Sequence, residues 1–274
     1  MQDILIIHHR NCFDGIAAAW AASLYFRARY HEKEITFHAA DYGTPPPDCT
    51  GKHTYIVDFS YPREILEEMQ KKAHALMVLD HHKTAQEALK GFEGAIFDMD
   101  RSGAGITWDW FFSRETRPWL IDCIEDRDLW RFKLPNTKRQ MAYIATLPMN
   151  VTSYDFLSSL KPDEVARKGD AILSYITNYG HKAIEHAVMR EIGGYSFWVI
   201  NISYQNCSDH LDLLMSEKEF DRAAYFFLHG SGQWQFGMRS RGEFDVSEIA
   251  KQYGGGGHKN AAGFVVDKLP WETR

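Results

Sequence analysis

Short apolar runs of strand length alternate with helical patterns through the first half of the chain. The strand-length runs lie at residues 4–8, 35–39, 54–57 and 75–79, and helical periodicity is found at residues 15–29, 63–73, 102–112 and 118–124. Alternation of this kind is typical of a parallel sheet with helices on both faces. The fold class predicted for the first half is therefore α/β.

The second half begins with a long, charged and periodic stretch at residues 162–192. Pro162 lies near its start and Gly193-Gly194 follow its end, as expected of a connecting helix. Strands are then predicted at residues 197–202, 223–228 and 234–238, with helices at 209–216 and 246–253. We therefore expect an N-terminal domain at residues 1–160, a connecting helix at 161–193 and a smaller α/β domain at 194–274.

Composition narrows the class of protein further. The 274 residues are 45% hydrophobic and 25% charged, which is ordinary for globular domains. The formal net charge of -6 argues against a long, sequence-independent grip on nucleic acid, which needs arrays of Lys and Arg. The longest apolar stretch, residues 16–26, is too short to span a membrane, which takes roughly 20 residues.

The N-terminal sequence and the cysteines indicate a compartment. Residues 1–5 contain no basic leader, so no secretory signal is expected. Cys12, Cys49, Cys123 and Cys207 form no CxxC pair, which makes a disulfide framework or a structural zinc site improbable. We therefore expect a protein of the reducing cytoplasm that has no membrane partner. A homodimer is compatible with the sequence.

Polar residues with metal-binding side chains follow three of the predicted strands. The first strand runs into His8-His9 and Asp14, the third into Asp58, and the fourth into Asp80-His81-His82. The carboxyl ends of parallel strands share one edge of a sheet, where buried unpaired carboxylates would be costly without a cation. Mixed His and Asp ligands suit Mn²⁺, Zn²⁺ or Fe²⁺. Singly, Asp14 could be a helix cap and His81-His82 surface residues, but their joint occurrence favours a metal site.

A run of four glycines, Gly254 to Gly257, precedes His258 near the C-terminal end. Successive glycines allow backbone N–H groups to converge on an anion. A flexible linker is the alternative. A predicted helix before the glycines and an apolar strand after them argue against that alternative.

These residues resemble the DHH phosphoesterase superfamily, in the subgroup with a DHH-associated C-terminal (DHHA1) domain that includes nanoRNases and exopolyphosphatase-like proteins. Residues 9–15 resemble the first motif of the family, Asp58 the second and Asp80-His81-His82 the third, while residues 125–130 resemble the fourth. The three letters DHH are a weak signal alone, but the order and spacing of all the motifs make it specific. The resemblance covers most of the chain.

The resemblance implies a catalytic domain with a dinuclear centre, usually of manganese, although Mg²⁺ or another divalent ion is compatible. The implied ligands are His9, Asp14, Asp58, His81 and Asp126, with Asp58 bridging both ions. Asp128 remains an alternative to Asp126. The implied catalytic residues are His82 and Asp80, and the implied substrate-binding residues of the DHHA1 domain are Gly255, Gly256, Gly257, His258 and Arg239.

The expected reaction is hydrolysis of a phosphoester or phosphoanhydride bond by a metal-bound hydroxide. The expected substrate is a small phosphorylated compound or a short oligonucleotide, cleaved by a phosphatase or exonuclease activity. A long nucleic acid is not expected as a partner. Hydrolysis of inorganic polyphosphate and a non-catalytic nucleotide-binding sensor are the alternatives.

The first motif departs from the family, whose members commonly have two Asp residues there. The earlier Asp is replaced around Asn11, and Phe13 resembles an insertion. One ion would then face less negative charge than the other, so that the two sites would be unequal. If another residue has taken the role of the missing ligand, His8 and Cys12 are the nearest candidates.

Overall fold

The computed structural model describes residues 3–30, 32–113 and 115–272. The chain divides into two compact units, Met1–Leu173 and Ser174–Arg274. No helix within the described ranges is long and apolar enough to cross a membrane.

Unit 1 is built on a five-stranded parallel sheet with the strand order β2-β1-β3-β4-β5. The strands are β1 (Ile4–His9), β2 (Ile35–Ala40), β3 (His53–Val57), β4 (Ala75–Asp80) and β5 (Ala95–Phe97). The central strands are almost continuously apolar, as expected when helices cover both faces of a sheet.

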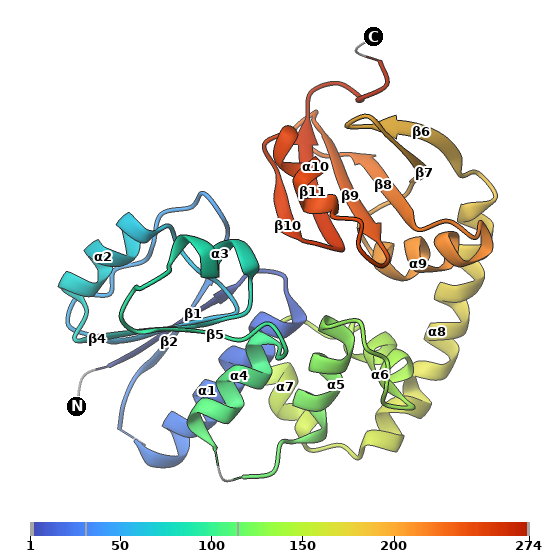
Figure 1. The fold of residues 1–274 in the computed structure, drawn as a ribbon. Coiled ribbons are helices and arrows are strands. Elements are labelled where there is room, and N and C mark those ends of the chain that lie inside the picture. Colours follow the sequence, from blue (N-terminus) through green and yellow to red (C-terminus); the bar gives the residue numbers. More distant parts are fainter. Residues whose placement is uncertain (1–2, 31, 114, 273–274) are drawn as a thin grey trace. The chain divides into compact units, whose positions relative to one another are not determined.

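Helices cover both faces of this sheet (Figure 1). The helices of this part of the chain are α1 (Phe13–Arg29), α2 (Arg63–Lys72), α3 (Lys83–Ala88), α4 (Gly103–Phe111), α5 (Trp119–Asp128), α6 (Thr137–Ile144), α7 (Val151–Ser158) and α8 (Pro162–Ile184), of which α8 continues into unit 2. Alternate residues of β1 enter separate cores: Ile4 and Ile6 pack with α1, α4, α5 and α7, and Leu5 and Ile7 pack with α2. The predicted parallel α/β fold is confirmed.

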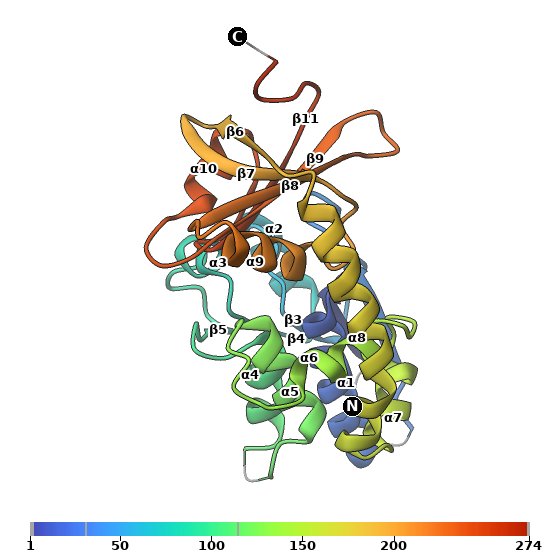
Figure 2. The same ribbon diagram turned by 90° about the vertical axis from the view of Figure 1, so that its right-hand side faces the viewer.

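Unit 2 contains a mixed six-stranded sheet with the order β10-β11-β9-β8-β7-β6. Its elements are β6 (Val188–Ile192), β7 (Tyr195–Asn201), α9 (Cys207–Glu217), β8 (Arg222–Leu228), β9 (Trp234–Ser240), α10 (Val246–Gln252), β10 (Gly256–His258) and β11 (Ala261–Val266). Only β7 and β8 pair in parallel within this sheet of described strands. Helices α10 and α9 pack on opposite faces, each over its own apolar core (Figure 2).

The predicted connecting helix at residues 161–193 is too long by about two turns. Helix α8 ends at Ile184, and residues 188–192 form β6, which pairs antiparallel with β7. Gly193 and Gly194, with φ angles of 58° and 85°, form the two-residue turn of this hairpin and do not end a helix. Two consecutive residues with positive φ are what the tight turns of β-hairpins require.

Candidate metal centre

Three adjacent strands of the parallel sheet deliver polar side chains to one edge. Strand β1 ends at His9, Asp58 follows β3 directly, and β4 ends at Asp80 ahead of His81. Strand β3 lies between β1 and β4 in the sheet. The structure thus gathers the strand-end residues at the position where α/β sheets bind ligands.

Asp58 has an unusual backbone conformation. Its φ angle is 53°, and its backbone N–H donates a hydrogen bond to the carbonyl oxygen of Leu79 at 2.9 Å. Residues other than glycine rarely adopt positive φ, and such strain is concentrated at functional sites. The strained residue is the one for which the family resemblance implies the bridging role.

Carboxylates surround the imidazole of His81. Its Nε2 atom lies 3.2 Å from Oδ1 of Asp58, 3.6 Å from Oδ2 of Asp128 and 3.8 Å from Oδ2 of Asp14. Asp14 and Asp58 are each only 1% exposed. Negative charge is therefore concentrated in a region with little access to water.

The pKa shifts of these groups reflect that concentration. Burial alone would lower the pKa of His81, but its hydrogen bond with Asp58 and the surrounding carboxylates raise this pKa to about 10. Burial raises the pKa of Asp14 and of Asp128. The pKa of Asp58 is lowered despite its burial, because His81 donates to it. The cluster therefore favours positive charge at its centre.

One oxygen of Asp58 has no hydrogen-bond donor. Its Oδ2 atom is buried and without a hydrogen-bond partner among the described residues, and Nδ1 of His9 is 3.8 Å away. Leaving such a group unsatisfied costs about 1–3 kcal/mol or more. A cation bound to this oxygen would remove that cost.

Asp58 belongs to three sets of donor atoms, one of which it forms with Asp80 and His82. The side chains of Asp14, Asp58 and His81 form one set, and those of His9, Cys12 and Asp58 form another, with the donor atoms of each set within 4.8 Å of one another. Ions that share a bridging carboxylate need this arrangement. The residues present therefore fit a dinuclear centre with Asp58 between the two ions.

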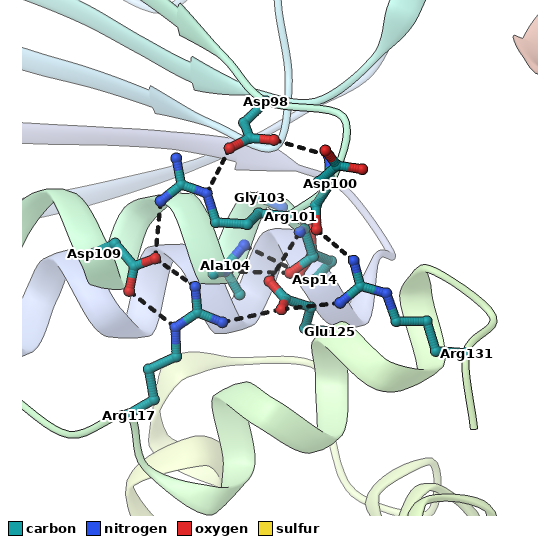
Figure 3. A network of polar contacts seen from close by, with 12 residues as sticks. Asp14, Asp98, Asp100, Arg101, Gly103, Ala104, Asp109, Arg117, Glu125 and Arg131 are labelled. Carbon is teal, nitrogen blue, oxygen red and sulfur yellow. Dashed lines mark hydrogen bonds and ion pairs between the residues drawn. The ribbon is translucent and has the colours of Figure 1, made fainter. Parts of the chain in front are cut away.

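The N-terminus of α4 fixes the carboxylate of Asp14. The backbone N–H of Gly103 donates to its Oδ2 at 2.5 Å and that of Ala104 to its Oδ1 at 3.0 Å (Figure 3). Helix N-termini favour anions because of their unpaired N–H groups and the helix dipole. Asp14 therefore lies within α1, with its side chain held by a second helix, and is not the cap of α1.

The predicted elements did not indicate that the start of α4 holds the carboxylate of Asp14. A Cβ atom on Gly103 would lie 2.5 Å from Cβ of Asp58 and 2.9 Å from Oδ2 of Asp14, so only glycine fits. Ser102 caps the helix by accepting from the N–H of Gly105 at 3.2 Å. The signal was the Ser-Gly-Ala-Gly segment ahead of an apolar helix, where a capping serine is followed by a glycine.

A charged network supports this helix start from α5 (Figure 3). Glu125 accepts a hydrogen bond from the backbone N–H of Ser102 at 3.1 Å and another from Arg117 at 3.0 Å. Arg117 also binds Asp109 of α4, and Asp109 accepts from Arg101 at 2.8 Å. The network ties α4 to α5, and thereby fixes the N–H groups that hold Asp14.

Asp80 positions His82. Oδ1 of Asp80 lies 2.7 Å from Nδ1 of His82 and accepts from the N–H of His81 at 2.7 Å, while Ser60 donates to Oδ2 at 2.6 Å. These contacts lower the pKa of Asp80 against the effect of burial and raise that of His82. Because both oxygens of Asp80 have partners, its implied catalytic role is better described as orientation of the His82 ring.

Of the two aspartates considered for the fourth motif, the structure places Asp128, and not the predicted Asp126, beside His81. Asp126 accepts hydrogen bonds from the backbone N–H groups of Lys133 at 2.8 Å and Leu134 at 3.2 Å, and from the hydroxyl of Thr137. Its carboxylate thus stabilises the loop after α5. Asp128, the alternative kept open by the sequence, is the residue beside His81.

These two aspartates should respond differently to the same substitution. We expect Asp126→Asn to lower the free energy of unfolding by about 1–3 kcal/mol, because loop N–H groups lose a charged acceptor. We expect Asp128→Asn to lower metal affinity at least roughly 10- to 100-fold with a small effect on metal-free stability. Chemical denaturation in EDTA and metal titration of both variants would measure this. The opposite pattern would restore Asp126 as the ligand.

In unit 2 the glycine run has a regular structure. Gly254, with a φ of 77°, follows the end of α10. Its backbone N–H donates to the carbonyl oxygen of Lys251 at 3.0 Å, and the N–H of Gly255 donates to the carbonyl oxygen of Ala250 at 2.9 Å. This is the hydrogen-bond pattern of a Schellman motif. The backbone N–H of Gly255 is therefore engaged within the helix end and does not support the anion-binding role implied for it.

The remaining residues implied in substrate binding lie on paired strands. Gly256, Gly257 and His258 form β10, which pairs antiparallel with β11. Arg239 of β9 donates to the hydroxyl of Ser208 at 2.7 Å and to the carbonyl of Met238 at 2.8 Å. The glycine run thus forms a helix end and the start of an edge strand, contrary to the flexible-linker alternative.

Comparison with known proteins agrees with this architecture. Residues 197–272 match the family model of the DHHA1 domain. The chain is 29% identical over 301 aligned residues to the uncharacterized protein R106 of Acanthamoeba polyphaga mimivirus, covering 97% of this chain and 68% of that protein.

Three solved structures share the fold at low sequence identity. An exopolyphosphatase-related protein from Bacteroides fragilis has a TM-score of 0.60 at 13% identity, over 96% of this chain and 86% of that one. Exonuclease RecJ bound to manganese has a TM-score of 0.55 at 13% identity, over 97% and 86%. The pGpG-specific phosphodiesterase PggH from Vibrio cholerae has a TM-score of 0.54 at 14% identity, over 97% and 93%. The chain thus carries a DHHA1 domain at residues 197–272, as the resemblance implied, and it shares the fold of these three proteins.

Proposed function

We propose that this protein is a divalent-metal-dependent phosphohydrolase that cleaves a phosphoester or phosphoanhydride bond of a small phosphorylated compound or a short oligonucleotide. The carboxylate of Asp58 supports this most directly. It is buried, has one oxygen without a hydrogen-bond donor among the described residues, and belongs to three sets of three potential ligand side chains. A fold shared with a phosphodiesterase and with an exonuclease agrees with this chemistry.

Divalent ions in such a centre activate water and neutralise charge on phosphoryl oxygens. The side chains proposed to hold them are His9, Asp14, Asp58, His81 and Asp128. Phosphoryl transfer depends mainly on positioning and on electrostatic stabilisation, so no protein nucleophile is needed. The ring of His82, oriented by Asp80 at 2.7 Å, is proposed to donate a hydrogen bond to a phosphoryl oxygen.

The nature of the substrate is proposed from charge and from the shared fold. The net charge of -6 disfavours long polyanions, for which extended arrays of Lys and Arg are needed. The pGpG-specific phosphodiesterase and exonuclease RecJ act, by their names, on nucleotide material. We propose short nucleotides as the substrate class and Mn²⁺ as a competent ion, in line with the manganese-bound RecJ structure.

The test is a panel of substrates incubated with the metal-free protein and with added Mn²⁺, and analysed for released products. The panel holds di- and trinucleotides, cyclic dinucleotides, a 3′,5′-bisphosphate nucleotide, pyrophosphate and polyphosphate. Metal-dependent turnover of a short nucleotide supports the proposal. Turnover of polyphosphate alone would move the protein to the alternative substrate class. Binding of nucleotides without turnover at any metal would overturn the enzymatic proposal and indicate a sensor.

His258 is proposed to recognise the phosphate of the substrate. We expect His258→Ala to lower kcat/KM by roughly 10- to 100-fold, because one charge-stabilising donor is removed, while the number of bound ions stays unchanged. His229→Ala, in an exposed loop of the same unit, is the matched control and should leave both unchanged. Loss of bound metal in His258→Ala would contradict the assignment to phosphate recognition.

A further inference from the structure

Cys12 occupies an unusual position at the start of α1. It is the N-cap residue of this helix and its side chain makes no capping hydrogen bond. Its thiol is free of disulfide bonding and partly buried. Serine, threonine, aspartate and asparagine are the side chains that cap helices well, so capping does not explain a cysteine here.

The Cys12 thiol lies in a constellation suited to a cation. Its sulfur, a ring nitrogen of His9 and a carboxylate oxygen of Asp58 are all within 4.8 Å of one another. Two ligands of one tetrahedral ion, at about 2.0–2.3 Å from the metal, are roughly 3.3–3.8 Å apart. Nδ1 of His9 and Oδ2 of Asp58 are separated by 3.8 Å.

A second observation points to a ligand in the same place. Asp58 is 1% exposed, and its Oδ2 atom, the one that faces His9, has no hydrogen-bond partner among the described residues. A buried oxygen without a donor, next to a thiol and an imidazole, is suited to binding a cation.

Asn11 does not donate a hydrogen bond to Oδ2 of Asp58. It lies in an exposed turn with a φ of 53°, a conformation that asparagine tolerates well. The positive φ turns the chain away from the direction of β1. The side chain of the next residue, Cys12, can therefore lie beside those of His9 and Asp58. The ligand that the first motif lacks as a carboxylate is therefore available as a sulfur.

We infer that Cys12 is a thiolate ligand of the ion held by His9 and Asp58, and that this site takes a thiophilic divalent ion, Zn²⁺ or Fe²⁺, in preference to Mn²⁺. Thiolates favour such ions, whereas carboxylates suit Mn²⁺ and Mg²⁺. The set proposed for the second ion, formed by Asp14, Asp58 and His81 with Asp128 nearby, has no sulfur. The centre would thus hold two ions of different chemistry. The inference rests on the proposed metal-dependent function only in that both place ions at Asp58.

The test is titration of the metal-free, full-length protein with Co²⁺, which reports thiolate coordination by a near-ultraviolet charge-transfer absorption. The wild-type protein should show this absorption, and Cys12→Ser and Cys12→Asp should not. Cys207→Ser, which changes the first residue of another helix, is the matched control and should keep it. Bound ion should also protect one thiol of the wild-type protein from alkylation.

Competition between Zn²⁺ and Mn²⁺ gives a second measurement. We expect Cys12→Asp to reduce the preference for Zn²⁺ over Mn²⁺ at this site by at least about tenfold, because a hard ligand replaces a soft one. Bound Co²⁺ without the charge-transfer absorption, or an absorption that persists in both variants, would overturn the inference and leave the proposed phosphohydrolase intact. Absence of any bound ion would overturn both, and bound ions with no turnover on any substrate would overturn the proposed function alone.

Discussion

Asp58→Asn should remove both ions and lower turnover by about three orders of magnitude or more, which corresponds to about 4 kcal/mol of transition-state stabilisation. Asn keeps the size of the side chain and one oxygen that can accept from His81, now 3.2 Å from Asp58. It replaces the other oxygen with an NH₂ group, which repels a cation. Since Asp58 is shared by the sets proposed for the two ions, one substitution affects both ions.

Thermal unfolding separates this effect from misfolding. Ions that bind only the folded wild-type protein should stabilise it by about 2.7 kcal/mol at a free concentration a hundredfold above Kd. Asp58→Asn should unfold near the wild-type Tm in EDTA and gain nothing from added metal. Asp48→Asn, which changes an exposed aspartate outside the cluster, should behave as wild type. An Asp58→Asn protein that keeps both ions and most of its turnover would exclude the bridging role.

The sheet edge could be predicted from sequence because strand ends are local signals. Apolar runs that stop at His9, Asp58 and Asp80 place these residues at one edge once the sheet is parallel. These residues share that edge whatever the strand order, in which β3 lies between β1 and β4. The conformation of Asp58 could not be predicted, since its positive φ depends on the hydrogen bond to Leu79 in the neighbouring strand.

The sequence pattern does not predict which of Asp126 and Asp128 lies beside the cluster. Both lie in the last turn of α5, and residues two apart on a helix point in nearly opposite directions. Which direction faces the sheet depends on how α5 packs. The loop at residues 133–137 fixes Asp126 by hydrogen bonds, and no local feature of the sequence announces those contacts.

Glycines were ambiguous for a related reason. Gly193-Gly194 and Gly254-Gly255 each follow a periodic segment, which suggests helix ends in both places. The first pair is a hairpin turn and the second a Schellman motif. The difference lies in whether the preceding residues pair with a strand, and only the tertiary fold decides that.

Gly103→Ala should damage the centre without changing any ligand. The added Cβ would meet Cβ of Asp58 at 2.5 Å, and its Cα and Oδ2 of Asp14 both at 2.9 Å. The first two atoms are at or next to backbone and cannot swing aside, so α4 or β3 must shift. We expect a loss of about 1–3 kcal/mol in the free energy of unfolding, as for other overpacked sites.

The same shift should move the N–H groups of Gly103 and Ala104 away from Asp14, to which they donate at 2.5 and 3.0 Å. We expect metal affinity to fall roughly 10- to 100-fold, as when outer partners of metal ligands are lost. Gly169→Ala is the matched control: its Cβ would collide with the carbonyl oxygen of Arg139, at a helix contact away from the cluster. It should lower Tm but keep the increase in Tm that metal produces, whereas Gly103→Ala should lose most of that increase. Equal metal-induced increases in the two variants would show that the start of α4 does not hold the centre together.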